Sequence, residues 1–549
     1  MRSIVNTDGR TAILTGVAAG VVTLLVYLGS LSCGFINLDD PYYITNNPLI
    51  KSLDLKALRR IFTEAHLAAW LPLTYASFAV DYHFWGDNPA GYHLTNILLH
   101  AANAFLVVLL ADRLFRERNV GRVAEGQGRW VYPGMLLLAG LFFSLHPLRV
   151  ESVAWAAERK DVLNGLFVLA TVLAYIGYAR RKDAGEVKGS LPLYLLSVVF
   201  FVLSLLAKQV SVTLPVILLL LDWYPLARPE RSRLMPLLVE KIPFFAISLL
   251  ITFVTVYFAV AEKKLVSMQA MPFYVRVLVS GNAIFEYCRL SLFPAGISPY
   301  FVLPKPLSYG YLVKTVLVFA LTLFLLRSAP RRPAVAATWF TFVILLAPVL
   351  AFVHAGDDIA IAARYTYLPA IAPGIAAAAW VAMLLDRLRT EGRRIATGLL
   401  LGSITLCLAA GIGITVKLIK VWHDTGTFWT RVIEIDPVGR AYGDRGVFYL
   451  INGRIAEAVD DFSAAIGIAE SVRMKSIYNL YAFRGVGLSD IGRLSEAVAD
   501  FDRAIALYPH PTYFQQRGAA LQALGRTAEA AEDFRRAGPK PPPIDWFGE

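Results

Sequence analysis

The chain has 549 residues, of which 56% are hydrophobic and 17% are charged, and its mean hydropathy is +0.54. This composition excludes a water-soluble enzyme and indicates a protein that crosses a membrane several times, since soluble domains carry about a quarter of charged residues. The net charge of +12 is explained by basic loops on one side of a membrane, so no nucleic-acid partner is predicted. Cys33, Cys288 and Cys407 stand far apart and show neither metal nor disulfide spacing.

The first apolar run covers residues 11–31 and follows two arginines. Two readings are open: a membrane span, or a cleaved signal peptide with a faint lipoprotein-like box at 30–33. The run is longer than the roughly 7–15 apolar residues of a signal peptide, so we predict an uncleaved span.

Ten further apolar segments follow along the chain. They cover residues 93–112, 130–145, 161–179, 191–207, 211–223, 242–260, 309–326, 334–353, 367–385 and 395–416. With the first run they predict an all-α polytopic bundle of about eleven spans within residues 1–420.

The placement of Lys and Arg predicts the orientation of these spans. Five alternate loops hold 20 basic residues, whereas the intervening loops at 146–160, 208–210 and 354–366 hold five. The basic loops and the N-terminus should therefore be cytoplasmic, and everything after residue 416 should lie outside the cytoplasm. This topology requires 273–293, which contains Arg276, Glu286 and Arg289, to lie along the interface without crossing.

A repeat dominates the chain after Trp422. Gly453-Arg-Ile-Ala-Glu-Ala-Val-Asp-Asp-Phe462 recurs with similar sequence at 492–501 and at 525–534, with spacings of 39 and 33 residues. This is the tetratricopeptide pattern of paired helices. We predict a repeat domain at 421–538 whose concave groove binds a protein partner, followed by a disordered Pro-rich tail at 539–549.

Adjacent carboxylates, Asp39 and Asp40, follow the first span directly and precede Pro41. One reading is a solvated loop start with an Asx turn. The other is a general base at the membrane boundary, where a neighbouring charge and partial burial raise the pKa of one carboxylate. We favour Asp40 as the base, with Asp39 second, because Pro41 fixes the backbone just after it.

Further polar groups are expected at the same, non-cytoplasmic ends of the spans. They are His93, His100, His146, Glu151, Arg159, Lys160, Asp161, Lys208, Arg364 and Tyr365. A carboxylate with several cations suits attack on a sugar bonded to a lipid phosphate, because the base deprotonates an acceptor hydroxyl while the cations hold the departing phosphate. We assign Arg364, Arg159, Lys160 and Lys208 to the phosphate and the other residues in this set to the substrate site.

Each of these residues also has a purely structural reading. Arg149, Arg159 and Lys160 are also read as interface anchors, and His93 and His100, seven residues apart, as packing residues on one helix face. No metal site is predicted, because no carboxylate or Cys stands at ligand spacing from these histidines. The chain shows no phosphate loop or dinucleotide fingerprint, so the only cofactor-like molecule expected is a lipid-linked sugar donor.

The order of these motifs resembles that of the transmembrane and tetratricopeptide repeat O-mannosyltransferases over nearly the whole chain. The residues that carry the resemblance are Phe35…Asp39-Asp40…Asn46-Asn47, Leu71-Pro72-Leu73-Thr74, Gly91-Tyr92-His93-Leu94-Thr95-Asn96…His100, His146-Pro147…Glu151…Arg159-Lys160-Asp161 and Arg364-Tyr365-Thr366-Tyr367-Leu368-Pro369.

The resemblance implies a fold similar to GT-C glycosyltransferases and transfer of a mannose-like sugar from a polyprenyl phosphate to Ser or Thr hydroxyls outside the cytosol. It also implies a catalytic aspartate pair, with the 146–161 loop and the Arg364 motif serving the donor. Two features depart from the family: Gln209 stands where members commonly have Glu, and the repeat array is short. A bacterial relative with a different sugar and acceptor would fit them. The site is expected to face the periplasm from an inner membrane in a bacterial protein, or the lumen of the endoplasmic reticulum in a eukaryotic one.

Two other functions remain open from the sequence. A non-enzymatic scaffold that recruits partners through its repeats would tolerate replacement of Asp39, Asp40 and Arg364, whereas an enzyme would not. A transporter fits less well, because the polar groups are expected at one face and not along the midplane.

Overall fold

The computed structural model describes residues 9–64, 70–118, 131–230, 234–261, 269, 271–304, 306–351, 359–471 and 477–539. The chain divides into two compact units, Met1–His423 and Asp424–Glu549, which we call unit 1 and unit 2. The division falls three residues after the predicted end of the membrane domain at 420. The predicted tail, from residue 540 onward, lies outside the described residues.

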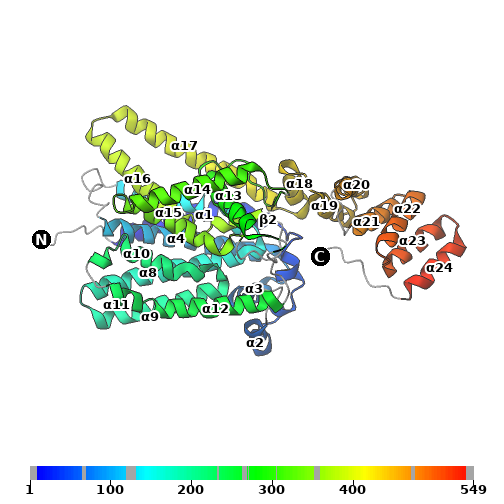
Figure 1. Cartoon of the computed structure of the whole chain (residues 1–549), viewed down its shortest axis with the longest axis horizontal. Coiled ribbons are helices and arrows are strands. Elements are labelled where there is room, and N and C mark those ends of the chain that lie inside the picture. The colour runs from blue at the N-terminus through cyan, green and yellow to red at the C-terminus, as the bar shows by residue number, and fades with distance from the viewer. Residues whose placement is uncertain are drawn as a thin grey trace. The chain divides into compact units, whose positions relative to one another are not determined.

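Unit 1 is built almost entirely of helices, as predicted (Figure 1). Its α-helices are α1 (Gly9–Tyr27), α2 (Leu55–Thr63), α3 (Pro72–Trp85), α4 (Pro89–Glu117), α6 (Val131–Ser144), α7 (Val150–Ala154), α8 (Arg159–Asp183), α9 (Val187–Ala207), α10 (Leu214–Trp223), α11 (Leu234–Val239), α12 (Ile242–Ala261), α13 (Phe273–Leu292), α14 (Tyr309–Ser328), α15 (Pro333–Leu346), α16 (Ile371–Thr390) and α17 (Arg394–Ile419). The described residues also contain one small antiparallel sheet, in which β1 (Phe301–Val302) pairs with β2 (Ile359–Ile361).

The predicted spans correspond to apolar helices of the structure. Within the described residues, eight helices are long and apolar enough to cross a membrane: Gly9–Ser32, Pro89–Glu117, Ala156–Asp183, Val187–Ala207, Leu234–Ala261, Tyr309–Ser328, Ile371–Thr390 and Arg394–Trp422. Val131–Ser144 with Pro147–Ala154 adds a ninth that is bent by 51°, and the shorter apolar helices Gln209–Trp223 and Pro333–Val349 match the two remaining predicted segments. The 273–293 segment forms α13, and its place along the interface stays a prediction.

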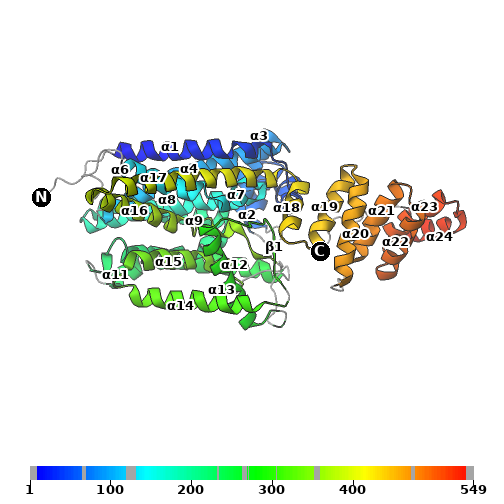
Figure 2. The same ribbon diagram turned by 90° about the horizontal axis from the view of Figure 1, so that it is seen from above.

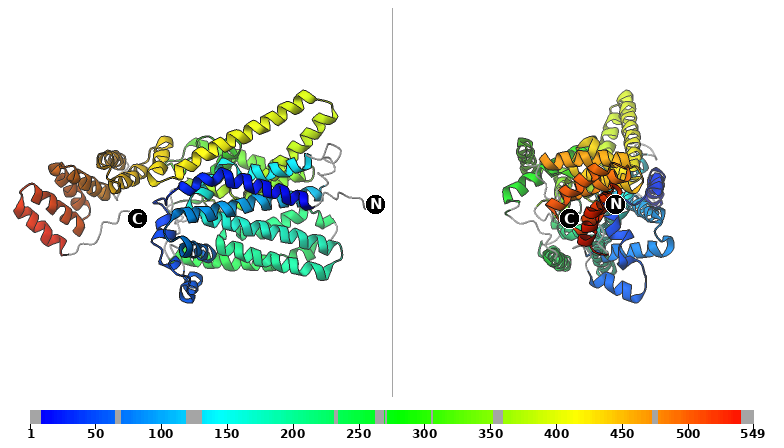
Figure 3. Two further views of the ribbon diagram at one scale, coloured as in Figure 1. Left: turned by 180° about the vertical axis from the view of Figure 1, so that it is seen from behind. Right: turned by 90° about the vertical axis from the view of Figure 1, so that its right-hand side faces the viewer.

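The basic loops gather at one end of unit 1. The N-terminal end of α1, the α8–α9 turn, helix α11 and the α16–α17 turn all lie at this end (Figures 1 and 2). Figure 3 shows the same arrangement from behind, with α16 and α17 leaving their common turn and diverging. The structure therefore puts the basic turns between α8 and α9 and between α16 and α17, and the basic residues that flank α11, on the same side of the bundle, as the positive-inside rule requires.

A buried ionic cluster holds the basic end together. Arg228 Nη1 donates to Tyr175 Oη and to Glu240 Oε2, each at 2.9 Å, and Tyr175 Oη donates to Asp222 Oδ1 at 2.7 Å. Lys241 Nζ donates to both Tyr175 and Asp222. Because buried charges need such partners, Asp222 serves here to join α8, α10 and the start of α12.

Unit 2 is a series of helix pairs. Its helices are α18 (Thr425–Ile435), α19 (Gly439–Ile451), α20 (Ile455–Ser471), α21 (Ile477–Asp490), α22 (Leu494–Leu507), α23 (Pro511–Ala523) and α24 (Thr527–Ala537). The repeated glycines explain the close pairing: a Cβ on Gly485 would lie 2.9 Å from the ring of Phe501, so only glycine fits there. Gly492, in the turn between α21 and α22, has φ of +78°, which glycine adopts without strain.

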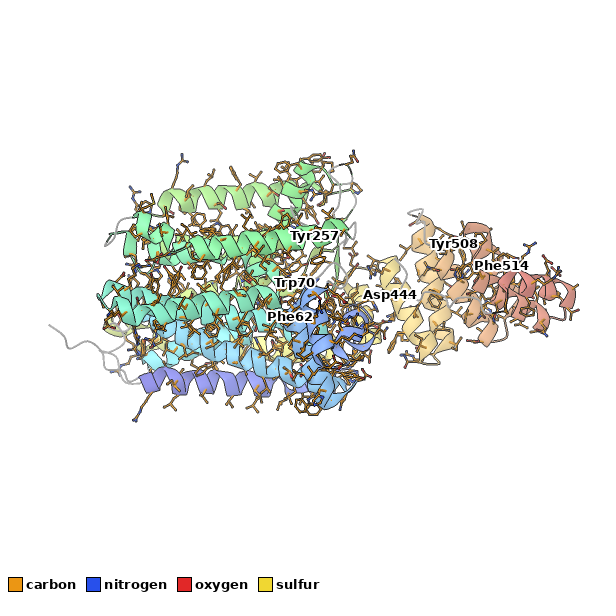
Figure 4. The ribbon with its side chains drawn as sticks, turned by 90° about the horizontal axis from the view of Figure 1, so that it is seen from below. Phe62, Trp70, Tyr257, Asp444, Tyr508 and Phe514 are labelled. Atoms are coloured by element: carbon orange, nitrogen blue, oxygen red, sulfur yellow. The ribbon has the colours of Figure 1, made fainter. Side chains whose placement is uncertain are left out.

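An Arg–Asp ion pair recurs in all three repeats, always 16 residues apart. It joins Arg445 to Asp461, Arg484 to Asp500, and Arg517 to Asp533, each through two parallel hydrogen bonds of 2.7–2.8 Å. The third nitrogen of each arginine reaches the preceding helix pair, at Thr430, Ser463 and Asp502 respectively. Arg517 also lies 5.7 Å from the centre of the Phe514 ring, which Figure 4 labels.

We expect Arg484→Met to destabilise the repeats by about 2–4 kcal/mol, because it leaves the nearly buried carboxylate of Asp500 without its partner. Hydrogen–deuterium exchange of the full-length protein would measure this as faster exchange of α21 and α22. The matched control is Arg493→Met, whose pair with Glu496 is half exposed, and it should leave exchange unchanged. Equal exchange in the two variants would show that the recurring pair contributes no stability.

Candidate active site

The predicted site residues come from five segments of unit 1 at the end away from the basic loops. They follow α1, lie in α4, and form the bend between α6 and α8. Lys208 precedes the short helix at 209–213, and Arg364 and Tyr365 lie in the one at 363–366. Figure 4 labels Phe62 and Trp70 near this end, where Trp70 Nε1 donates to Phe62 O at 3.1 Å and Gln209 Nε2 donates to Trp70 O. Gln209, at the position where the family commonly has Glu, therefore binds backbone here.

Asp40 is fully buried at the start of a π-helical turn, Pro41–Thr45. Its Oδ2 accepts a hydrogen bond from Ile36 N at 2.6 Å, and its Oδ1 accepts one from Ala157 N at 2.8 Å. Burial raises the pKa of Asp40 to about 7, against the opposing effect of these two donors. Such a pKa suits a base, but both oxygens are already engaged, and geometry decides before pKa does.

Asp39 occupies the open position next to it. Its side chain is 37% exposed, and its Oδ2 lies 3.6 Å from Lys160 Nζ. One carboxylate of the pair is thus held by backbone hydrogen bonds while the other faces outward. The structure gives the open position to Asp39 and the held position to Asp40, although the place of Pro41 favours Asp40 as the base.

The bend between α6 and α8 supplies most of the charged groups. Pro147 begins a 3-10 turn at Pro147–Arg149, α7 follows, and a second turn at Ala156–Glu158 leads into α8. Proline lacks the N–H that would continue a helix, so the chain turns here. Glu158 and Asp161 lie at the N-terminal end of α8, where the helix dipole stabilises negative charge.

Three cations converge in front of this helix end. Lys160 Nζ lies 3.0 Å from Glu158 Oε1, and Lys208 Nζ lies 2.5 Å from Asp161 Oδ1 and 3.4 Å from Glu158 Oε2. Arg364 Nε lies 3.4 Å from Glu158 Oε1. The three residues predicted from distant parts of the sequence are therefore brought to one point, and we call Lys160, Lys208 and Arg364 the cation cluster.

Arg364 lies at the edge of the cluster on a 3-10 turn, Ala363–Thr366. Its Nη1 donates to Glu151, whose Oε2 also accepts from Arg364 N at 3.2 Å. The guanidinium lies 4.9 Å from the ring centre of Tyr365 and 5.5 Å from that of Trp155. Glu151 and Tyr365, predicted as substrate-site residues, thus hold this arginine in place.

Arg159, unlike the other predicted cations, binds groups on α3 and α4. It is fully buried; its Nη2 donates to Asp81 Oδ2 at 2.5 Å and to Tyr92 O at 2.8 Å, and its Nε donates to Asn96. Its Nη1 lies 3.4 Å from Ser77 Oγ. Four of its five N–H donors are thus engaged within the protein, so Arg159 joins α3, α4 and α8, and its full burial excludes the interface-anchor reading.

The three predicted histidines hold segments together. His93 Nε2 lies 3.4 Å from Gly34 O, and His146 Nε2 lies 3.0 Å from Ser291 O. His100 bonds Tyr367 Oη at 2.7 Å through Nδ1 and Ser144 O at 3.0 Å through Nε2. Within the described ranges, no group of three or more His, Cys, Asp or Glu side chains is placed to hold a metal ion.

Arg149 is fully buried, which excludes the interface-anchor reading. Its Nη2 donates to Thr366 Oγ1 at 2.5 Å, two residues from Arg364, and its guanidinium lies 5.7 Å from the Tyr367 ring centre. The bend at 147–158 and the turn at 363–366 are thereby joined by two arginines, Arg149 and Arg364.

Two residues of the site were not assigned a role from the sequence. Glu158, next to the Arg159-Lys160-Asp161 motif, contacts all three cations. Trp155 lies against Arg364 and stacks on Trp422, with ring centres 5.2 Å apart. A small pocket lies beside them, lined by Pro147, Val150, Glu151, Ile297, Pro299, Ala363, Leu418, Val421 and Trp422.

Comparison with known proteins finds relatives with one shared description. The chain is 29% identical over 206 residues to protein O-mannosyl-transferase TMTC4 of Mus musculus, and 29% identical over 208 residues to Tmtc1 of Drosophila melanogaster. It is 32% identical over 167 residues to tmtc2 of Xenopus laevis. These matches cover 29–36% of this chain and 18–27% of the relatives, so the chain spans about a quarter of the length of the curated relatives that it matches.

No family model matches the chain. All three of these relatives are named protein O-mannosyl-transferases of the TMTC series, and they are the proteins whose motifs the sequence resembles. The chain is therefore a helical, polytopic relative of the TMTC protein O-mannosyl-transferases, as its motifs predict.

Proposed function

We propose that the chain is a membrane glycosyltransferase that moves a mannose-like sugar from a polyprenyl phosphate to a Ser or Thr hydroxyl of a protein. Transfer takes place at the end of unit 1 that lies away from the basic loops. The names of the relatives support the reaction class. The observation that carries the proposal for this chain is the half-open carboxylate of Asp39, 3.6 Å from Lys160 at the edge of the cation cluster.

In this proposal each group has a part in the reaction. The acceptor oxygen attacks the anomeric carbon, the bond from that carbon to the phosphate oxygen breaks, and its electron pair leaves with the phosphate. Asp39 takes the hydroxyl proton, because it is the carboxylate of the pair with an open side. Lys160, Lys208 and Arg364 stabilise the charge on the departing phosphate, and Arg159 keeps their supporting helices in place.

The repeats of unit 2 are proposed to bind the protein acceptor in their concave groove, as repeat arrays commonly do. Selection of the acceptor would then be separate from the chemistry in unit 1. Deleting residues from 440 onward should spare transfer to a short peptide and lower transfer to a folded acceptor protein.

A direct test uses the purified full-length protein in lipid nanodiscs with mannosyl polyprenyl phosphate and a Ser/Thr-containing peptide. Mass spectrometry should detect a hexose on the peptide that depends on both substrates. A protein that binds the lipid but transfers no sugar to any hydroxyl acceptor would support the scaffold instead.

The sidedness of the site is tested by cysteine labelling in intact cells. In a background without Cys33, Cys288 and Cys407, we expect an impermeant maleimide to label Asn452→Cys, on the exposed turn between α19 and α20, and to miss Ala184→Cys, at the basic end. The opposite pattern would place the repeats in the cytoplasm and contradict the proposed topology.

A further inference from the structure

Glu158 is the point on which the cation cluster converges. Its carboxylate lies within 3.0–3.4 Å of Lys160, Lys208 and Arg364, and its side chain is 1% exposed, against 9–12% for the three cations. Glu158 thus lies deeper than the three cations, and Lys160 also contacts the half-open Asp39. A phosphate arriving at the cluster would meet cations that are already bound to an anion.

The charge balance around the cluster makes this competition strong. Besides Glu158, each cation has a carboxylate of its own: Asp39 beside Lys160, Asp161 beside Lys208 and Glu151 beside Arg364. Three cations therefore face four carboxylates before any substrate binds. Because all of these groups except Asp39 are largely buried, their charges are poorly screened, and an added anion is repelled by the carboxylates as well as attracted by the cations.

We propose that Glu158 is a positioning residue that competes with the substrate phosphate: it holds the three cations in place in the empty site and expels the phosphate product after transfer. This inference rests on the proposed function, in which the cation cluster binds the donor phosphate. The donor is a phosphodiester with one negative charge. When the bond to the anomeric carbon breaks, the phosphate keeps the electron pair and becomes a monoester with a charge of about −1.5 to −2 at pH 7. Repulsion from Glu158 therefore rises in the step that forms the product.

Removal of the Glu158 charge should strengthen phosphate binding, whereas most substitutions in a binding site weaken it. Glu158→Gln keeps the size of the side chain and removes its charge, so it should bind the product-like monoester more tightly than wild type, by about tenfold or more. A donor-like diester carries about half the charge. It should gain only about the square root of that factor, or roughly threefold, because the repulsion scales with the charge of the ligand. If Glu158 only supported the fold, Glu158→Gln would not tighten binding, and the monoester would not gain more affinity than the diester.

The experiment measures affinity by titration calorimetry on the full-length protein in nanodiscs, with farnesyl phosphate as the monoester and farnesyl methyl phosphate as the diester. Asp87→Asn is the matched control: it removes one carboxylate from the surface, where Asp87 is 62% exposed beside Lys51, and should leave both affinities unchanged. If Glu158→Gln fails to fold, Glu158→Asp takes its place in the test. It keeps the carboxylate but moves it away from the cations by one methylene, so it should show a smaller gain in affinity for the monoester.

The outcomes separate the inference from the proposed function. Tighter binding in Glu158→Gln, larger for the monoester than for the diester, supports competition by Glu158. Weaker or unchanged binding of the monoester in a folded variant overturns the inference and leaves the donor site standing. Wild-type protein that binds farnesyl phosphate no better than farnesol overturns the donor site itself, and the inference with it.

Discussion

Replacing Asp39 with asparagine is expected to lower turnover at least a hundredfold while the protein folds normally. Asparagine has nearly the same shape but cannot accept the proton of the attacking hydroxyl, and a positioned base contributes about 10²–10⁴ to such a rate. The side chain is 37% exposed and its Oδ2 lies 3.6 Å from Lys160 Nζ, so the substitution should disturb little packing. Sugar transfer to a Ser/Thr peptide, measured at saturating donor, gives the change in turnover.

Two variants make this result interpretable. Asp87→Asn removes a carboxylate from the exposed surface and should keep full activity. Asp40→Asn should lose stability, because an amide nitrogen would replace one of the two oxygens that accept from Ile36 N and Ala157 N, which leaves a buried N–H unpaired. If Asp39→Asn stays active and a folded Asp40→Asn is inactive, the base is Asp40 and the order argued from the structure is reversed.

Arg159→Met is expected to prevent stable folding, and not merely to weaken donor binding. The substitution leaves Asp81 buried and charged without its partner, and breaking such a pair costs about 3–5 kcal/mol. That is a large part of the stability of a typical protein, so we expect low yield of monodisperse protein and a lower melting temperature. Size-exclusion chromatography and thermal unfolding in detergent measure both.

A double variant distinguishes the loss of a charge partner from the loss of a site for the donor. Asp81→Leu combined with Arg159→Met replaces the whole pair with apolar groups and should recover most of the lost stability. Arg60→Met, which removes a half-exposed pair with Glu64 on α2, should change nothing. A well-folded Arg159→Met protein with a specific defect in donor use would return Arg159 to the phosphate site.

The spans could be predicted because they depend on local composition alone. A run such as 395–416 must be a helix in lipid whatever its neighbours are, since its backbone has no other hydrogen-bonding partners there. The repeats could be predicted for a similar reason, since Gly485 and Phe501 recur at fixed spacing and need each other to pack. Both parts of the fold rest on contacts that are short in sequence or repeated in it.

The roles within the site could not be predicted in this way. Asp39 and Asp40 are neighbours, and what separates them is a hydrogen bond from Ala157, which is 117 residues away from Asp40. Arg159 and Lys160 are also neighbours, yet α8 turns the first toward Asp81 and the second toward Asp39. Sequence places such residues on one side of a membrane, but a helix directs adjacent side chains about 100° apart, and only the fold says which one faces the substrate.

The recurring Arg–Asp pair bears on how the repeat array can lengthen. Duplication of the middle helix pair, α21 with α22, would place a new copy of Arg484 against Asp502. Asp502 is the residue that Arg517 contacts in the present array, so the new contact is also favourable. Duplication of the last pair would instead place a copy of Arg517 against Arg535, which follows Phe534 as Asp502 follows Phe501. Tandem copying is therefore tolerated at one junction and opposed by like charges at the next, so evolution or an engineer should extend this array from its interior.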